Sequence, residues 1–198
     1  MSVRPDPTTT GLLLAAGEGR RYGSPKGLVV QDGVPWVARA ATALLDGGCG
    51  DVLVVTGAAG EEVEALLAGH RDERVGTVRC GTWEAGMGES LRAGLTSLAT
   101  RGRTVPLRAV VHLVDLPDVG ADVVARVLQA GGKGRDGLAR AAYGGVPGHP
   151  VLLGQDHWSG VLARAAGDSG ARAYLRRARP VLVECGDLAS GRDVDNPG

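Results

Sequence analysis

Residues 11–26 of the chain read GLLLAAGEGRRYGSPK, and this stretch decides how we expect the rest of the chain to fold. It opens with an apolar run over residues 12–16 that does not alternate with polar residues. A run this short predicts a strand buried on both faces, as in a parallel sheet. Glycines and cations follow it: Gly17, Gly19, Arg20, Arg21, Gly23 and Lys26. A glycine-rich loop exposes N–H groups, and with several cations beside them it suits a polyphosphate.

Two common phosphate-binding motifs do not fit this loop. The Walker loop needs Gly-Lys-Ser/Thr, whereas Lys26 follows Pro25 and precedes Gly27. The dinucleotide fingerprint G-x-G-x-x-G fails because the third glycine comes one residue late. Pro25 disfavours helical angles at Ser24, so we expect an extended loop up to Lys26. The alternative is a solvated surface loop, but the buried strand that feeds the loop favours phosphate binding.

The remaining pattern alternates strands with helices, which predicts parallel βαβ units in a three-layer α/β/α domain with a mostly parallel sheet. The expected strands cover residues 12–16, 51–56, 75–79, 110–114, 138–143 and 181–184, and the main expected helices cover 36–45, 61–67, 119–130 and 173–179. We expect one domain over residues 1–198, with a frayed leader at 1–9 and a tail at 190–198 that closes on the active site. Ligands of such sheets bind at the carboxyl ends of the strands, where the 11–26 loop begins.

Composition excludes several classes of protein. The 198 residues carry equal numbers of acidic and basic side chains, so we expect no nucleic-acid partner. The N-terminus has no apolar signal segment and no stretch is long enough to span a membrane, so we expect no membrane partner. Three widely spaced cysteines form neither a zinc motif nor a disulfide framework, which favours a cytoplasmic location.

The expected strand over residues 110–114 runs directly into Asp115. A carboxylate at the end of a central parallel strand lies at the ligand-binding edge of the sheet. Mg²⁺ prefers oxygen ligands and usually takes one or two carboxylates. The alternative is an Asp-x-Pro turn, but a phosphate loop on a neighbouring strand favours the metal. Asp118 is expected to begin the helix over residues 119–130.

Two glycine-rich segments carry further candidates. Gly86 and Ser90 lie at the entrance of a helix, where the alternative is an ordinary helix start. His149 is flanked by Gly148 and Pro150, with Pro147 just before, which predicts a defined, extended turn ahead of a strand. A single histidine is more often structural than catalytic, so the residue types alone leave its role open.

Two segments near the C-terminus complete the set. Asp168 or Ser169 can cap the helix over residues 173–179, and Arg172 beside free N–H groups forms a potential anion site. A capped surface helix is the alternative there. The tail carries Asp195, for which a frayed acidic end is the alternative.

These motifs together resemble one family. LAAGxGxRxGxPK, at residues 14–26, resembles the signature loop of nucleotidyltransferases that activate small phosphorylated molecules with an NTP. Its two-alanine form is similar to the molybdenum cofactor cytidylyltransferases rather than the guanylyltransferases. Five further segments resemble elements of the same family, in the same order: residues 83–95, 115–117, 145–150, 167–172 and 192–197. Where that family often has asparagine, three residues before Trp83, this chain has Cys80.

The resemblance implies a Rossmann-like nucleotidyltransferase fold and Mg²⁺-dependent transfer of a nucleoside monophosphate. The implied donor is CTP, the implied acceptor is the molybdopterin form of the molybdenum cofactor, and pyrophosphate leaves. The implied catalytic residues are Arg21, Lys26 and Asp115, and the metal ligands are Asp115 and Asp195. The implied nucleotide-binding residues are Leu14, Ala15, Ala16, Gly17, Gly19, Arg20, Lys26, Gly86 and Ser90, and the acceptor-binding residues are His149, Asp168 and Arg172.

Other functions stay open from the sequence. This chain could instead transfer GMP from GTP to molybdopterin, or a nucleotide to a sugar phosphate. A carrier protein could bind nucleotide or cofactor without catalysis, and a molybdoenzyme or its maturation chaperone is the implied receiving partner. The intact set of Arg21, Lys26 and Asp115 favours an enzyme.

Overall fold

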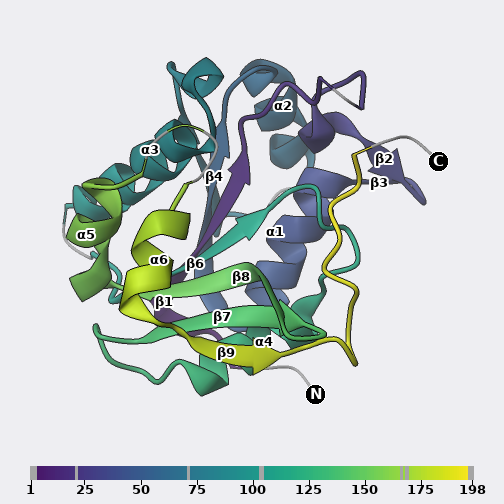
Figure 1. Cartoon of the computed structure of the whole chain (residues 1–198). Coiled ribbons are helices and arrows are strands. Elements are labelled where there is room, and N and C mark those ends of the chain that lie inside the picture. The colour runs from purple at the N-terminus through teal and green to yellow at the C-terminus, as the bar shows by residue number, and fades with distance from the viewer. Residues whose placement is uncertain are drawn as a thin grey trace.

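A seven-stranded sheet lies between two layers of helices (Figure 1). The structure is a computed structural model that describes residues 4–20, 22–70, 72–102, 105–165, 167 and 170–195. The strands are β1 (Asp6–Ala15), β2 (Val30–Gln31), β3 (Val34–Pro35), β4 (Cys49–Thr56), β5 (Val75–Arg79), β6 (Arg108–Leu113), β7 (Leu138–Tyr143), β8 (Val146–Gly154) and β9 (Val181–Glu184). The α-helices are α1 (Trp36–Asp46), α2 (Gly60–His70), α3 (Met87–Ala99), α4 (Ala121–Ala130), α5 (Trp158–Leu162) and α6 (Arg172–Ala178), and 3-10 turns cover Lys26–Leu28, Trp83–Ala85 and Gln155–His157.

The sheet order is β5-β4-β1-β6-β8-β7-β9. Neighbouring strands pair in parallel except where β8 runs antiparallel between β6 and β7. β2 and β3 form a separate two-stranded hairpin. The predicted fold class, a three-layer α/β/α domain with a mostly parallel sheet, is therefore confirmed. The carboxyl ends of β1, β4 and β6 meet at one edge of the sheet.

Each face of the sheet buries its own apolar cluster. Helices α1, α2 and α4 pack on one face around residues such as Leu13, Leu44 and Val54. Helices α3, α5 and α6 pack on the other face around residues such as Leu12 and Leu95. Adjacent residues of β1 therefore point into different clusters, which explains why the run at residues 12–16 is apolar at every position.

The predicted leader over residues 1–9 was wrong from Asp6 onward, because β1 already begins there. The Asp6 carboxylate accepts hydrogen bonds from the Thr8 amide and hydroxyl at 2.9 and 2.6 Å. It also accepts one from the buried guanidinium of Arg108 on β6, at 2.6 Å. Arg108 also donates to the hydroxyl of buried Thr9. These polar contacts extend the strand into a segment whose Pro and Thr residues suggested fraying.

Two further predictions need correction. Asp118 does not begin a helix, since α4 begins at Ala121 after Gly120, and the Asp118 carboxylate binds the C-terminal segment instead. The predicted turn around His149 is part of β8, because the chain reverses earlier, at Gly144 and Gly145. Both of those glycines have positive φ, which a tight β7–β8 turn requires.

None of the helices in the described part of the chain has the length and hydrophobicity needed to cross a bilayer. Cys49, Cys80 and Cys185 are all buried and free.

Two helical glycines give opposite predictions for stability. On α3, a Cβ at Gly94 would lie 2.5 Å from Leu12 Cδ1 and 3.0 Å from Val55 Cγ2, and both side chains are fully buried. On α2, a Cβ at Gly69 would meet nothing within 4 Å. We expect Gly94→Ala to lower the free energy of unfolding by about 1–3 kcal/mol, because overpacking outweighs helix propensity.

The matched control, Gly69→Ala, should raise that free energy by a few tenths to about 1 kcal/mol. Urea unfolding followed by circular dichroism measures both. Equal effects of the two substitutions would contradict the packing described for α3.

Candidate functional site

Lys26 holds two carboxylates together at the edge of the sheet. Its Nζ donates to Asp115 Oδ2 at 2.9 Å and to Asp195 Oδ1 at 2.8 Å. The side chains are 13%, 22% and 32% exposed for Lys26, Asp115 and Asp195, so the cluster is shielded on most sides. The other Asp115 oxygen, Oδ1, is buried and has no hydrogen-bond partner among the described residues. An unpartnered buried carboxylate oxygen is costly unless something else binds it.

The three residues come from distant parts of the chain. Asp115 follows β6, and Lys26 follows the loop that leaves β1, the strand that pairs with β6 in parallel. Asp195 comes from the C-terminal segment, which returns across the sheet edge after β9 (Figure 1). The Val194 amide donates to the Asp115 carbonyl at 3.0 Å, so the backbones of the two acidic segments are joined beside the carboxylates.

The loop after β1 closes on itself through glycine. Gly19 has φ +67°, and a Cβ there would lie 1.9 Å from the Ser24 carbonyl oxygen. The Gly23 amide donates to the Gly19 carbonyl at 2.9 Å. Only glycine can take this conformation and this close approach together, so Gly19 sets the path of the loop toward Lys26.

An open cavity of about 540 Å³ lies between this loop, the start of α3 and the end of β6. We call it the loop cavity; it is lined by Leu14, Ala16, Gly17, Glu18, Gly19, Arg20, Lys26, Trp83, Glu84, Gly86, Met87, Ser90, Leu113, Val114, Asp115 and Asp195. It gathers all the nucleotide-binding candidates except Ala15. Ala15 packs into the core with the cluster under α1 and α2, since its side chain alternates with those of Leu14 and Ala16. Arg21 lies outside the described residues.

Trp83 lines one wall of the loop cavity and depends on a glycine behind it. A Cβ at Gly57, just after β4, would lie 2.8 Å from Trp83 Cγ and 2.5 Å from the Ala16 carbonyl oxygen. Gly57 therefore lets the indole lie against the end of β1. Sequence reasoning noted Trp83 but gave no role to Gly57, whose importance depends on contacts between segments far apart in the chain.

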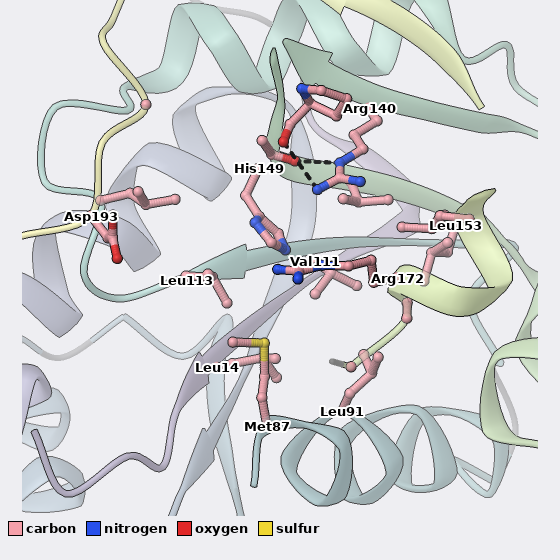
Figure 2. Close-up of a pocket in the computed structure, with 18 of the residues that line it drawn as sticks. Leu14, Met87, Leu91, Val111, Leu113, Arg140, His149, Leu153, Arg172 and Asp193 are labelled. Carbon is pink, nitrogen blue, oxygen red and sulfur yellow. Dashed lines mark hydrogen bonds between the residues drawn. The ribbon is translucent and has the colours of Figure 1, made fainter. Parts of the chain in front are cut away.

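A second cavity, of about 290 Å³, adjoins the loop cavity. Its floor is apolar, with Leu14, Leu91, Val111, Leu113, Val151, Leu153 and Leu175 among its lining residues. Figure 2 shows His149, Arg140 and Arg172 on the wall opposite α3. We call it the arginine cavity. Two predicted acceptor-binding residues, His149 and Arg172, thus share one cavity, whereas Asp168 lies outside the described residues.

Arg140 on β7 is a cavity residue that sequence reasoning missed. Its guanidinium donates to the Gly148 carbonyl at 2.8 Å and to the Pro147 carbonyl at 3.2 Å (Figure 2). Burial and the nearby charge of Arg172 lower its pKa below the ordinary value of an arginine. The strand LARAAY looks like any half-buried strand, so only the pairing of β7 with β8 reveals where Arg140 lies.

His149 is neutral at physiological pH. Burial is the largest cause, and the charges of Arg140 and Arg172 together with His112 also act to lower its pKa to about 3. Its ring and the Arg172 guanidinium point toward one another above β6 (Figure 2). The arginine cavity therefore presents two guanidinium charges and an uncharged imidazole, which favours an anionic occupant.

The two cavities meet at Asp115. Leu14, Met87, Leu113 and Asp115 line both of them. A group bound in one cavity can therefore approach a group bound in the other next to a carboxylate. The arrangement therefore offers two neighbouring binding volumes with Asp115 at their boundary, and Lys26 and Asp195 beside it in the loop cavity.

The ion pairs of Lys26 make its titration a test of the site. Burial opposes the charged form, but the hydrogen bonds and charges of Asp195 and Asp115 outweigh burial and raise its pKa above 10.5. The stability that this ammonium contributes is therefore present below pH 10.5 and is lost as pH rises through the folded-state pKa. We expect NMR titration of the Lys26 Cε resonance to give a pKa above 10.5, and Asp195→Asn to lower it.

Lys133 is the other lysine of the chain, so the two resonances are readily assigned with a Lys133→Arg variant. A Lys26 pKa at or below 10.5 in the wild-type protein would show that the ammonium does not bridge the carboxylates in solution.

Comparison with known proteins agrees with this architecture. The chain is 36% identical over 200 residues to nicotine blue oxidoreductase of Paenarthrobacter nicotinovorans, covering 96% of this chain and 93% of that protein. The fold is similar to that of a nucleotidyl transferase from Methanothermobacter, with a TM-score of 0.77 at 21% identity and 95% and 92% of the two chains covered. It is also similar to Rv0371c of Mycobacterium tuberculosis in a complex with manganese, with a TM-score of 0.65 at 23% identity and 89% and 86% covered.

At such identities the two structures bear on the fold alone. The family is shown by the sequence itself, since residues 11–181 match the MobA-like NTP transferase domain. This match spans the β1 loop, Asp115, His149 and Arg172. The chain therefore belongs to the family of nucleotidyltransferases with a MobA-like NTP transferase domain.

Proposed function

We propose that this nucleotidyltransferase transfers CMP from CTP to the phosphate of molybdopterin and releases pyrophosphate, with Mg²⁺ as its metal. The observation that carries the proposal is the meeting of Lys26, Asp115 and Asp195 where two cavities join. One cavity has the glycine-rich loop that suits a triphosphate, and the other has the cations that suit an anionic acceptor.

The carboxylate pair fits a divalent metal, on which this family typically depends. Asp115 Oδ1 is buried without a partner among the described residues, and Asp195 lies across the same ammonium. No group of three His, Cys, Asp or Glu side chains occurs in the described ranges that could hold an ion alone. Mg²⁺ takes one or two carboxylates, the number that Asp115 and Asp195 supply, and completes its shell with water and phosphate. When bound, the metal would neutralise charge on the reacting phosphates.

Lys26 and the loop hold the donor in this proposal. The amides of the β1 loop, Gly17 and Gly19 among them, bind the β- and γ-phosphates, with Arg20 and Arg21 adding positive charge. Lys26 leaves the carboxylates to bind the triphosphate. Gly86 and Ser90 at the start of α3, with Leu14 and Ala16, hold the nucleoside. Ala15 supports the strand from the core side.

The acceptor binds in the arginine cavity. Its phosphate is already an anion at neutral pH, so no general base is needed. The acceptor is oriented by Arg172, Arg140 and the neutral His149. Asp168 comes shortly before Arg172 in the sequence, ahead of helix α6. An acceptor phosphate oxygen attacks the α-phosphorus of CTP, a new P–O bond forms, and the bond to the β-phosphate oxygen breaks as pyrophosphate leaves. Positioning and charge neutralisation account for the rate.

The choice of CTP and molybdopterin follows from the two-alanine loop and the diagnostic segment at residues 145–150. The product would pass to a molybdoenzyme or its maturation chaperone, in the cytoplasm. With GTP as the donor, or a sugar phosphate as the acceptor, the same transfer reaction would join other substrates. A carrier protein would bind the nucleotide or cofactor without turnover.

One observation favours a second candidate function. The relative with 36% identity is named an oxidoreductase, and nicotine blue is in its name. The apolar floor of the arginine cavity suits a flat dye. The loop cavity lacks the G-x-G-x-x-G fingerprint, but its glycines and cations offer a place for the phosphates of a reduced nicotinamide dinucleotide as the hydride donor. In that case hydride passes from the dinucleotide to the dye and no pyrophosphate forms.

Substitution of Asp115 tests the proposed reaction. We expect Asp115→Asn to lower the rate of Mg²⁺-dependent pyrophosphate release from CTP and molybdopterin by about 10²–10³-fold, with Lys26→Ala similar, because each removes charge placed for the transition state. Asp122→Asn, on the exposed first turn of α4, is the matched control and should leave the rate unchanged. Full turnover by Asp115→Asn would remove this residue from the mechanism.

The same wild-type protein separates the candidate functions. We expect the protein to release more pyrophosphate with CTP than with GTP, ATP or UTP. We expect it to oxidise no NADH when nicotine blue is present. Oxidation of NADH with nicotine blue, without pyrophosphate from any NTP, would favour the reductase. Tight CTP binding without either product would favour a carrier.

A further inference from the structure

The segment between β9 and Asp195 contains no helix or strand, yet it delivers one of the two site carboxylates. After a turn at residues 186–188, it runs from β9 back past the sheet edge (Figure 1). An unanchored chain reaches about 3.4 Å per residue, so even a short free stretch would let Asp195 move well away from Lys26. Something must therefore hold this segment close to the site.

Asp118 supplies the central anchor. One carboxylate oxygen, Oδ2, accepts hydrogen bonds from the Ser190 amide at 2.7 Å, the Ser190 hydroxyl at 2.6 Å and the Gly191 amide at 3.3 Å. Asp118 lies in the short β6–α4 connection, which also carries Asp115. The same connection thus provides one site carboxylate and holds the segment that provides the other.

A second contact fixes the segment at the same place. Gly191 has φ +62°, and a Cβ there would lie 2.1 Å from Tyr143 Cε2 on β7. Gly191, whose amide is itself held by Asp118, therefore lies directly against the tyrosine ring. From here the chain runs to Val194, whose amide donates to the Asp115 carbonyl, and then to Asp195.

We propose that Asp118 is a positioning residue, which acts on the metal and nucleotide site through Asp195. The proposal rests on the proposed function, because it takes Asp115 and Asp195 as the carboxylates that hold the divalent ion. It assigns to the Asp118–Ser190 contact a role beyond stability. Loss of the contact leaves Asp115 and Lys26 in place and lets Asp195 leave the site.

A double-mutant cycle tests this assignment. Mn²⁺ binding in the presence of CTP, without acceptor, is measured by electron paramagnetic resonance for wild type, Asp118→Asn, Asp195→Asn and the double variant. Asparagine keeps one oxygen acceptor but loses the charge that strengthens these hydrogen bonds, so we expect Mn²⁺ binding to weaken by about tenfold in Asp118→Asn. The double variant should bind no more weakly than Asp195→Asn alone, because in this proposal Asp118 acts on the ion through Asp195 and not through Asp115.

Two controls separate positioning from general damage. Gly191→Ala loosens the same segment by a steric route and should reproduce the effect of Asp118→Asn. Asp122→Asn removes an equal negative charge from the first turn of α4, and this variant should bind Mn²⁺ as the wild type does. Trypsin should cut after Arg192 faster in Asp118→Asn and Gly191→Ala than in Asp122→Asn, which reports release of the segment without any metal.

The outcomes distinguish failure of this inference from failure of the proposed function. Wild-type protein that binds neither Mn²⁺ nor CTP would refute the proposed function. Wild-type binding that is unchanged in Asp118→Asn, or losses that multiply in the double variant, would refute the positioning role alone. A fall in thermal stability without a change in Mn²⁺ affinity would also refute it.

Discussion

The site depends on one charged group, the ammonium of Lys26. It is bound to two carboxylates that would otherwise repel each other, and it joins segments from the beginning, the middle and the end of the chain. Each group is largely shielded, so these contacts are screened less by water and salt than surface ion pairs. In the proposed reaction a divalent ion replaces the Lys26 ammonium between the two carboxylates. The ammonium then binds the triphosphate instead.

The sheet brings these charges together. β1 and β6 are parallel neighbours, so the loop after one and the acidic residue after the other emerge at the same edge. The helical layers bury both faces, which leaves this edge as the place where backbone N–H groups and charged side chains can face a ligand. The two cavities share Asp115 there, so the proposed donor and acceptor sites are adjacent.

The sequence predicted the parts of this arrangement that depend on local pattern. The apolar run at residues 12–16, the strand before Asp115 and the alternation of helices with strands indicated the fold and the meeting of Lys26 with Asp115. The sequence could not predict contacts made by segments without regular secondary structure. Asp118 looked like a helix start, because its true partners at Ser190 and Gly191 lie in a segment without periodicity. Arg140 was missed because an arginine in a strand has no local signal for the cavity it lines.

The most direct test of the account is a crystal structure of the protein with CTP and Mn²⁺, in which anomalous scattering locates the metal. We expect the ion between Asp115 and Asp195, the triphosphate along residues 17–26, and Lys26 moved from the carboxylates to a phosphate. An ion and a triphosphate bound elsewhere, with Lys26 still held between Asp115 and Asp195, would contradict it.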